Sequence, residues 1–228
     1  MKKRLKINGI IMILAAIAIV SFPKIFLRSS APSARENVLV VLGTFLILMG
    51  QLFRVAARGY KSEHSLNGKA LIEDGPYSLV RNPMYLGILS IGVGIIFLLF
   101  HLWVLSVFLV IFIMRYILLI FTEEKKLIVA FPKDYQDYCR KVPRLIPSLS
   151  AVMKTEVSVY LPLKLGWIKK EIGSMAAVLL GAILLKSAIV IYSNGMKAYL
   201  PQVLAMLLAM ILFLVFMLYL NRKALQNS

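Results

Sequence analysis

The chain is poor in the residues that hold metals and cross-links. It has one cysteine, Cys139, and two histidines, His64 and His101. A single cysteine excludes an internal disulfide and a cysteine-based metal site. The two histidines lack the spacing of metal ligands, so we interpret each as a surface or interface residue and expect no metal centre. Internal repeats and low-complexity tracts are also absent from the sequence.

Apolar sequence is what the chain has in abundance. Of its 228 residues 60% are hydrophobic, and the mean hydropathy is +0.83. Apolar runs of about 20 residues can cross roughly 30 Å of hydrocarbon as helices, whose backbone groups are hydrogen-bonded internally. We therefore expect an all-α integral membrane protein. Six spans are predicted, at roughly 7–23, 38–57, 83–100, 102–121, 174–192 and 200–220.

The spans divide the chain into three parts. Residues 1–57 hold two plain helices, residues 58–150 hold nearly all the unusual polar residues, and residues 151–228 hold an interfacial stretch and two further helices. Trp167 is expected to anchor that stretch at the membrane surface. The first apolar run could also be a signal peptide, but Pro32 follows the best cleavage site, so we expect an uncleaved anchor.

The formal net charge of +17 would usually indicate nucleic-acid binding. Here its distribution indicates a membrane instead, because most of the 27 basic residues fall on one side of the predicted spans. By the positive-inside rule both termini are cytoplasmic, in a bacterial-type inner membrane. The basic face would attract anionic lipid headgroups. Lys186 lies within the fifth span near its outer end, and we expect it to snorkel towards water.

The third and fourth spans are predicted to form a tight antiparallel hairpin, since only the region around His101 and Leu102 joins them. Small residues let helices approach closely, and we interpret those on the third span as ordinary packing positions. They are Gly87, Ser90, Gly92 and Gly94.

Polar clusters occupy both feet of this hairpin, which would form a pocket at the membrane surface. At the first foot, Asn82 fits a helix N-cap and Pro83 a first helical turn. Neither role explains the other polar residues crowded there, Tyr77, Arg81 and Tyr85. At the second foot, Glu123 and Glu124 end the fourth span, and Arg115 lies two turns deeper in the same helix. An ionisable residue at membrane depth is a functional candidate.

Taken in order, these segments resemble the isoprenylcysteine carboxyl methyltransferase and phospholipid methyltransferase superfamily. The resemblance rests on Arg81-Asn82-Pro83-Met84-Tyr85-x-Gly87, Glu123-Glu124, Tyr135-x-x-Tyr138 and Val142-Pro143-Arg144-x-Ile146-Pro147. It implies a membrane enzyme that moves a methyl group from S-adenosylmethionine (SAM) to a lipid or isoprenoid-linked acceptor. The cofactor-binding residues that it implies are Lys69, Ala70, Leu71, Ile72, Tyr77, Asn82, Pro83, Met84, Tyr85, Glu123 and Tyr135.

Two positions depart from the superfamily pattern. Asn82 replaces a common histidine; it can hydrogen-bond a cofactor but cannot titrate. The arginine that engages a prenylcysteine carboxylate would fall on Leu119, and Arg115, one turn away, is our candidate to replace it. If the acceptor is an amine, a proton must be lost, and Glu123 or Glu124 is the nearest base, with Glu124 assigned the catalytic role.

Two other functions compete with this interpretation. The Tyr138-Cys139-Arg140-Lys141-Val142-Pro143 tail also resembles that of membrane sterol reductases, which bind NADPH in the corresponding place, although this chain lacks their extra helices. A non-catalytic membrane protein, such as a small transporter or a chaperone, is the second alternative. Binding of SAM, of NADPH or of neither would distinguish the three.

Overall fold

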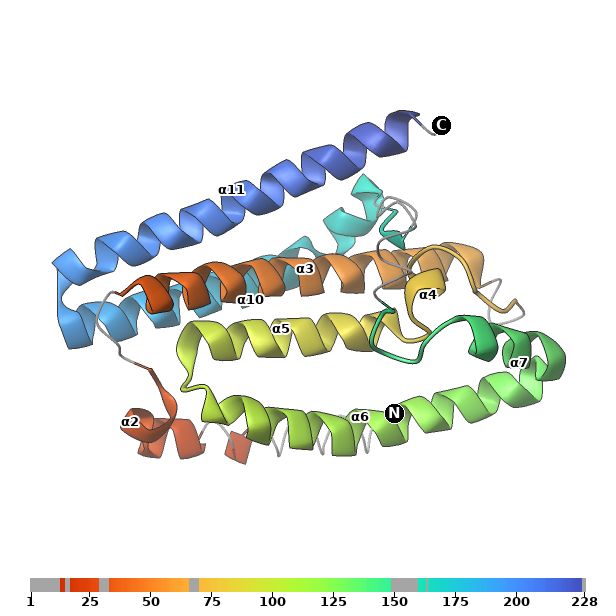
Figure 1. The fold of residues 1–228 in the computed structure, drawn as a ribbon, viewed down its shortest axis with the longest axis horizontal. Coiled ribbons are helices and arrows are strands. Elements are labelled where there is room, and N and C mark those ends of the chain that lie inside the picture. Colours follow the sequence, from red (N-terminus) through yellow and green to blue (C-terminus); the bar gives the residue numbers. More distant parts are fainter. Residues whose placement is uncertain are drawn as a thin grey trace.

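The computed structural model describes residues 13–14, 17–28, 33–65, 70–148, 160–162 and 164–226. Within these ranges the chain is helical, and its one β-type contact is an isolated bridge between Leu27 and Phe100. The helices form an elongated bundle (Figure 1). They are α2 (Pro23–Phe26), α3 (Ala34–His64), α4 (Pro76–Leu79), α5 (Pro83–Leu99), α6 (Trp103–Ala130), α7 (Pro132–Lys141), α10 (Leu165–Asn194) and α11 (Met196–Gln226).

Four of the described helices are long and apolar enough to cross a membrane: Ala34–His64, Trp103–Ala130, Gly166–Asn194 and Met196–Tyr219. They confirm the all-helical, integral membrane class that hydropathy predicts. The expected span at 83–100 is instead the shorter apolar helix α5, of 17 residues. Much of the expected span at 7–23 lies outside the described residues. The total of six spans therefore stays a prediction.

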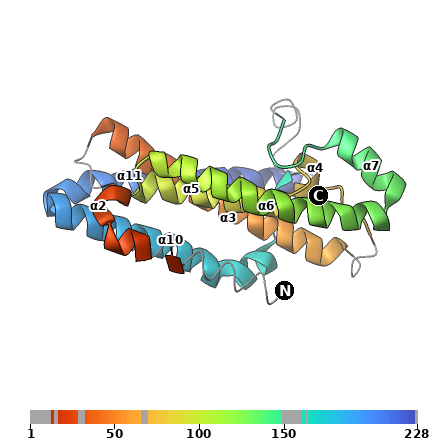
Figure 2. The ribbon, with the colours of Figure 1, turned by 90° about the horizontal axis from the view of Figure 1, so that it is seen from below.

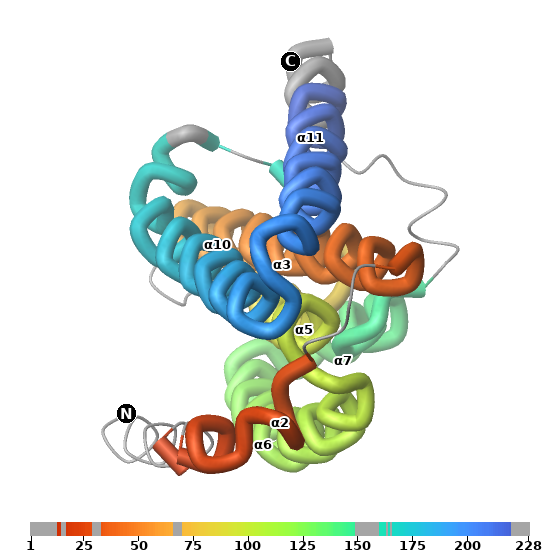
Figure 3. The backbone as a smooth tube through the Cα atoms, turned by 90° about the vertical axis from the view of Figure 1, so that its left-hand side faces the viewer, coloured from red at the N-terminus to blue at the C-terminus, as the bar shows by residue number. Residues whose placement is uncertain are grey.

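Helix α3 lies at the centre of the bundle, with α5 on one side and α10 and α11 on the other (Figure 3). Glycines bring α5 against α3. A Cβ atom on Gly94 would lie 2.6 Å from the Gly43 carbonyl oxygen, and one on Gly87 would lie 2.6 Å from that of Gly50. These two glycines of α5 therefore serve the contact with α3, and the third described glycine of this helix, Gly92, faces α6, where Phe108 covers it.

The turn between α5 and α6 lies at the same end of the bundle as α2, whereas α4 and α7 lie at the other end (Figure 1, Figure 2). This arrangement places the start of α5 and the end of α6 together. The α2 end is tied to the turn by backbone bonds, since Arg28 donates to the Leu99 carbonyl and His101 donates to the Phe26 carbonyl.

The structure contradicts the expected membrane anchor at Trp167. This side chain is only 5% exposed and lies over Gly59 of α3, where a Cβ atom would collide with the indole ring. Its Nε1 donates to Glu63 Oε1 at 2.7 Å. The indole is therefore a packing residue between α10 and α3, because the missing side chain at Gly59 leaves room for it.

The expectation that Lys186 snorkels is wrong. Its side chain is completely buried, and Nζ donates to Glu36 Oε1 at 2.6 Å. Glu36 lies in the first turn of α3, on a different helix. Because the counter-charge is supplied inside the bundle, the ammonium group has no need to reach water.

Candidate functional site

The segment before α5 is shaped by a glycine and two prolines. Gly75 has φ = 60°, and a Cβ atom there would lie 2.7 Å from the Tyr60 ring, so only glycine fits. Pro76 and Pro83 stand in the first turns of α4 and α5, where a missing N–H costs little. The short helix α4 and the longer helix α5 thus start in succession at this end of the bundle.

Asn82 occupies the predicted N-cap position of α5, but its side chain makes no capping bond. Its Nδ2 instead donates to the Arg144 carbonyl oxygen at 3.1 Å. The Arg81 backbone N–H donates to the Pro143 carbonyl oxygen at 2.9 Å. Residues 143–144, which follow α7, are therefore fastened across the start of α5.

A cavity of about 560 Å³ opens between these segments. Its size lies within the range of small-molecule and cofactor sites, about 300–1,000 Å³. Its walls come from α4, the start of α5, the end of α6 and the start of α7, with one residue from α3. The lining residues include Lys61, Tyr77, Arg81, Asn82, Pro83, Met84, Tyr85, Glu123, Glu124, Lys126, Leu127, Phe131 and Tyr135.

The two adjacent glutamates have different environments. Glu123 is exposed and accepts a hydrogen bond from the Tyr85 hydroxyl at 2.9 Å. Glu124 is 6% exposed and accepts from Arg144 Nε and Nη2 at 2.9–3.2 Å. Arg81 Nη1 lies 3.4 Å from its Oε1. Successive side chains on a helix point about 100° apart, which is why neighbours face different partners.

The ion pair with Glu124 also holds Arg144 in place. The bonds to the carboxylate raise the pKa of the Arg144 guanidinium, which lies 4.6 Å above the centre of the Phe121 ring. Glu124 therefore joins three separate segments: its own helix, the turn before α5 and the chain after α7.

Two tyrosines, Tyr77 of α4 and Tyr135 of α7, line the cavity, and Tyr138 of α7 lies behind them. Burial raises the pKa of Tyr77, Tyr135 and Tyr138, so their phenols stay neutral at physiological pH. The Tyr138 hydroxyl donates to the Tyr77 carbonyl oxygen at 2.6 Å, which fastens α7 to α4. Neutral phenol rings offer flat apolar surfaces with a polar edge, suited to an aromatic ligand.

Most of the residues singled out from the sequence line this one cavity: Tyr77, Asn82, Pro83, Met84, Tyr85, Glu123, Glu124 and Tyr135. Ala70, Leu71 and Ile72 precede α4 and do not line it, and Lys69 lies outside the described residues. Arg115 is half-buried in α6 and also does not line it. Eight residues separate it from Glu123, or about 12 Å along a helix axis.

Arg81 is a cavity residue whose role the sequence left unassigned. Its side chain is 11% exposed. Its Nη1 donates to Cys139 Sγ, while its Nε is buried without a hydrogen-bond partner in the described part of the chain. The sequence feature that could have identified Arg81 is its position directly before Asn82-Pro83, because the turn at these residues directs the Arg81 side chain towards Glu124. Because the positively charged Arg81 side chain lines the cavity, it is a candidate partner for an anionic group of a ligand.

Comparison with known proteins gives two matches. The phospholipid methyltransferase family matches residues 12–134 of this chain. The cobalt-zinc-cadmium resistance protein CzcN of Cupriavidus metallidurans is 33% identical over 117 residues. That match covers 50% of this chain and 51% of the relative, so the chain spans about half the length of the curated protein it matches. No solved structure matches.

Proposed function

The chain belongs to the phospholipid methyltransferase family, and on this premise we propose that it methylates a lipid or lipid-linked acceptor with SAM bound in the cavity at the feet of α5 and α6. The observation that carries the proposal is the convergence of the motif residues on one cavity from three separate segments. The family supports the reaction, methyl transfer by a membrane protein. The cofactor and the acceptor are our inference.

The side chains around the cavity suit the charges of SAM. That cofactor carries a carboxylate, an ammonium group, a sulfonium and an adenine ring. Glu123 offers a carboxylate for a cationic group, and the Arg81 side chain offers a positive charge for a carboxylate. Tyr77 and Tyr135 offer neutral rings for a flat base. The carboxylate of the cofactor, one of its two cationic groups and its adenine ring thus each have a suitable partner.

The chemistry that SAM supplies when bound is an electrophilic methyl group on a sulfonium. The task of this chain is then to hold the acceptor in line, because proximity and orientation provide much of the rate of such a displacement. A carboxylate acceptor needs no base, whereas an amine must lose a proton. The oxygens of Glu124 already accept bonds from Arg144. We therefore assign proton acceptance to Glu123, which is open to the cavity, and propose that Glu124 positions Arg81 and Arg144.

Arg115 is the residue from which we infer the chemistry of the acceptor. This half-buried guanidinium lies deeper in α6 than the cavity and makes no hydrogen bond or ion pair with another residue in the described ranges. We propose that it contacts an anionic group of the acceptor, which approaches from the bilayer side of α6. The name of the CzcN relative refers to metal resistance and specifies no methyl acceptor.

Isothermal titration of the full-length protein in detergent tests the cofactor. SAM and its demethylated product should both release or absorb heat, and NADPH should not. Glu123→Gln keeps the side-chain shape and removes the charge, so it should weaken SAM binding by about tenfold or more, the value of one hydrogen bond to a charged group, about 1.5–3 kcal/mol. Lys133→Gln changes an exposed charge on α7, away from the cavity, and serves as the control.

The other outcomes decide between the alternatives. Heat with NADPH and none with SAM would replace the methyltransferase with a reductase. Heat with neither would favour a non-catalytic membrane protein. For the acceptor, lipid extracts from cells with and without the gene should differ by a methylated species in mass spectrometry. Arg115→Gln should abolish that species while leaving SAM affinity unchanged.

A further inference from the structure

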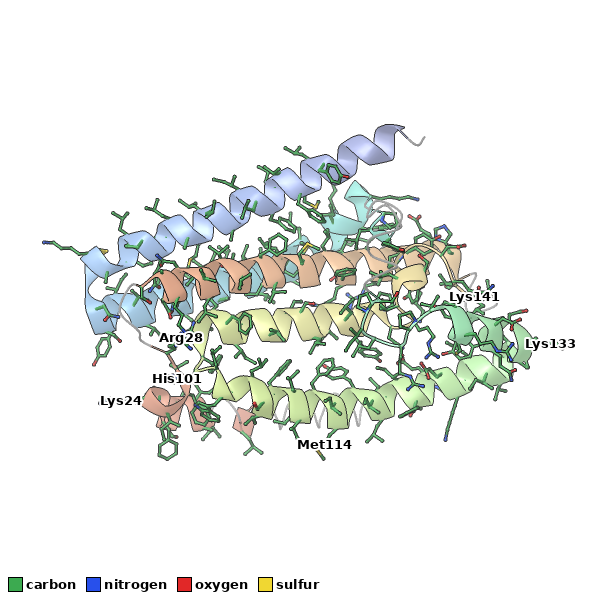
Figure 4. All side chains as sticks on the ribbon, viewed as in Figure 1. Lys24, Arg28, His101, Met114, Lys133 and Lys141 are labelled. Carbon is green, nitrogen blue, oxygen red and sulfur yellow. The ribbon has the colours of Figure 1, made fainter. Side chains whose placement is uncertain are left out.

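A second charged cluster lies at the opposite end of the bundle from the proposed SAM cavity. Figure 4 shows Arg28 and His101 at this end and Lys133 and Lys141 at the other. Arg28 donates from Nε to Glu36 Oε2 at 2.9 Å and from Nη1 to the Phe100 carbonyl oxygen at 2.7 Å. Lys186 Nζ donates to the other oxygen of Glu36 at 2.6 Å. The exposed fractions of Arg28, Glu36 and Lys186 are 6%, 3% and 0%.

This cluster carries one more positive charge than negative. Arg28 and Lys186 share the single carboxylate of Glu36, and each makes its only described ion pair with it. The other acidic residues of the described chain lie between Glu63 and Glu171 in sequence, towards the opposite end of the bundle. A buried charge without a counter-charge is unfavourable, so an additional anion near the cluster would be stabilising.

A cavity of about 270 Å³ opens directly beside the cluster. We call it the distal pocket. Its polar wall consists of Arg28, Ser33, Arg35, Glu36 and His101, and two leucines complete it. The side chains of Arg35 and His101 make no hydrogen bond or ion pair with another described residue. The hydroxyl oxygen of Ser33 accepts from the Glu36 backbone N–H at 3.2 Å, which leaves its proton available for donation.

The donors around the distal pocket therefore outnumber its acceptors. Both oxygens of Glu36 are occupied by Arg28 and Lys186, so this carboxylate does not compensate the charge of Arg35. Arginine presents paired N–H groups that match the oxygens of a phosphate. The pocket lies between the start of α3 and the turn that precedes α6, and these two helices are long and apolar enough to cross a membrane. Their ends lie at the depth of lipid headgroups.

We propose that the distal pocket binds a phosphate group, held by Arg35, Ser33 and His101 and stabilised by the excess positive charge of the Arg28–Glu36–Lys186 cluster. An anionic phospholipid headgroup and free phosphate share this chemistry. Leu39 and Leu102 give the pocket an apolar side that suits the glycerol and acyl portion of a lipid. The site is separate from the SAM cavity and does not depend on the methyltransferase function.

Native mass spectrometry of the full-length protein in detergent tests the proposal, with three probes titrated separately. They are phosphatidylglycerol, diacylglycerol with the same acyl chains, and inorganic phosphate. Phosphatidylglycerol should bind the unmodified protein more tightly than diacylglycerol does. Arg35→Gln should weaken that binding by about tenfold, as expected for the loss of a charge-assisted hydrogen bond. Arg35 is exposed, so this variant should fold normally, with an unchanged melting temperature.

Lys24→Gln is the matched control, because Lys24 is an exposed basic residue at the same end that does not line the pocket. It should leave the affinity unchanged. If millimolar phosphate displaces phosphatidylglycerol, and Arg35→Gln weakens phosphate binding as well, the site is supported and free phosphate is one of its ligands. If phosphate does not displace phosphatidylglycerol, the ligand is the lipid. Equal binding of diacylglycerol and phosphatidylglycerol would overturn the proposal. So would an equal effect of Lys24→Gln and Arg35→Gln, since that would show a general surface charge.

Discussion

The buried Arg28–Glu36–Lys186 cluster makes a quantitative prediction about stability. Glu36→Gln keeps the side-chain shape but leaves Arg28 and Lys186 buried with no counter-charge. Removing one partner of a buried ion pair costs about 3–5 kcal/mol. Lys186→Met should cost far less, no more than about 1 kcal/mol. It deletes one charge-assisted bond but leaves Arg28 and Glu36 as a balanced pair and removes the excess buried cation.

Thermal unfolding in detergent measures the difference. Cys139 is the only cysteine and is half-buried, so a thiol-reactive dye reports unfolding at one position. For a chain of this size 1 kcal/mol shifts Tm by roughly 2–4 °C. Glu36→Gln should therefore lower Tm by roughly 6–20 °C, and Lys186→Met by less than about 4 °C. Lys170→Met, which changes an exposed lysine of the same helix, is the control.

A double variant tests whether the single carboxylate of Glu36 compensates both buried cations. Glu36→Gln combined with Lys186→Met leaves a single buried cation in place of two, so it should melt at a higher temperature than Glu36→Gln alone. If Lys186→Met alone lowers Tm as much as Glu36→Gln does, the idea that one carboxylate compensates two cations is wrong. The same conclusion follows if the double variant is the least stable of the three.

Three further predictions concern other parts of the bundle. Glu124→Gln should lower the free energy of unfolding by about 1.5–3 kcal/mol, because it weakens the charged hydrogen bonds to Arg144. Glu123→Gln should leave Tm unchanged. A larger drop in Tm for Glu123→Gln than for Glu124→Gln in the same assay would contradict the roles assigned to the two glutamates. Gly94→Ala should destabilise the protein, because its Cβ atom would lie 2.6 Å from a backbone oxygen of α3. Gly173 lies in open space, so Gly173→Ala should stabilise the protein by roughly 0.5–1 kcal/mol. Equal changes in Tm for the two variants would contradict the close packing of α5 on α3. Reporter fusions at the C-terminus and in the turn at Gly195 should report opposite sides of the membrane, and the same side for both would disprove the predicted topology.

The membrane class and many of the residues around the proposed SAM cavity were predictable from the sequence, because each depends on local patterns. The expected tight packing of α5 against α6 was wrong, since α5 packs mainly on α3. Long apolar runs require helices in a bilayer whatever their neighbours are. Pro76, Pro83 and Gly75 set their own backbone angles, so the turn before α5 could be located. The two polar clusters had to meet, since an antiparallel hairpin returns the chain to the level at which it began.

The partners of individual side chains were decided by the tertiary structure. Lys186 and Glu36 are 150 residues apart in sequence, and nothing near either residue reveals the other. Glu123 and Glu124 are indistinguishable in the sequence, and both line the cavity. Yet Glu123 accepts a hydrogen bond from Tyr85 and Glu124 pairs with two arginines, because packing fixes the rotation of α6 about its own axis. The same holds for Gly87 and Gly94, which pack on α3 rather than on α6. Hydropathy determines that a helix forms and where it lies in the membrane, but the rotation and register of each helix depend on how all the neighbouring surfaces fit together.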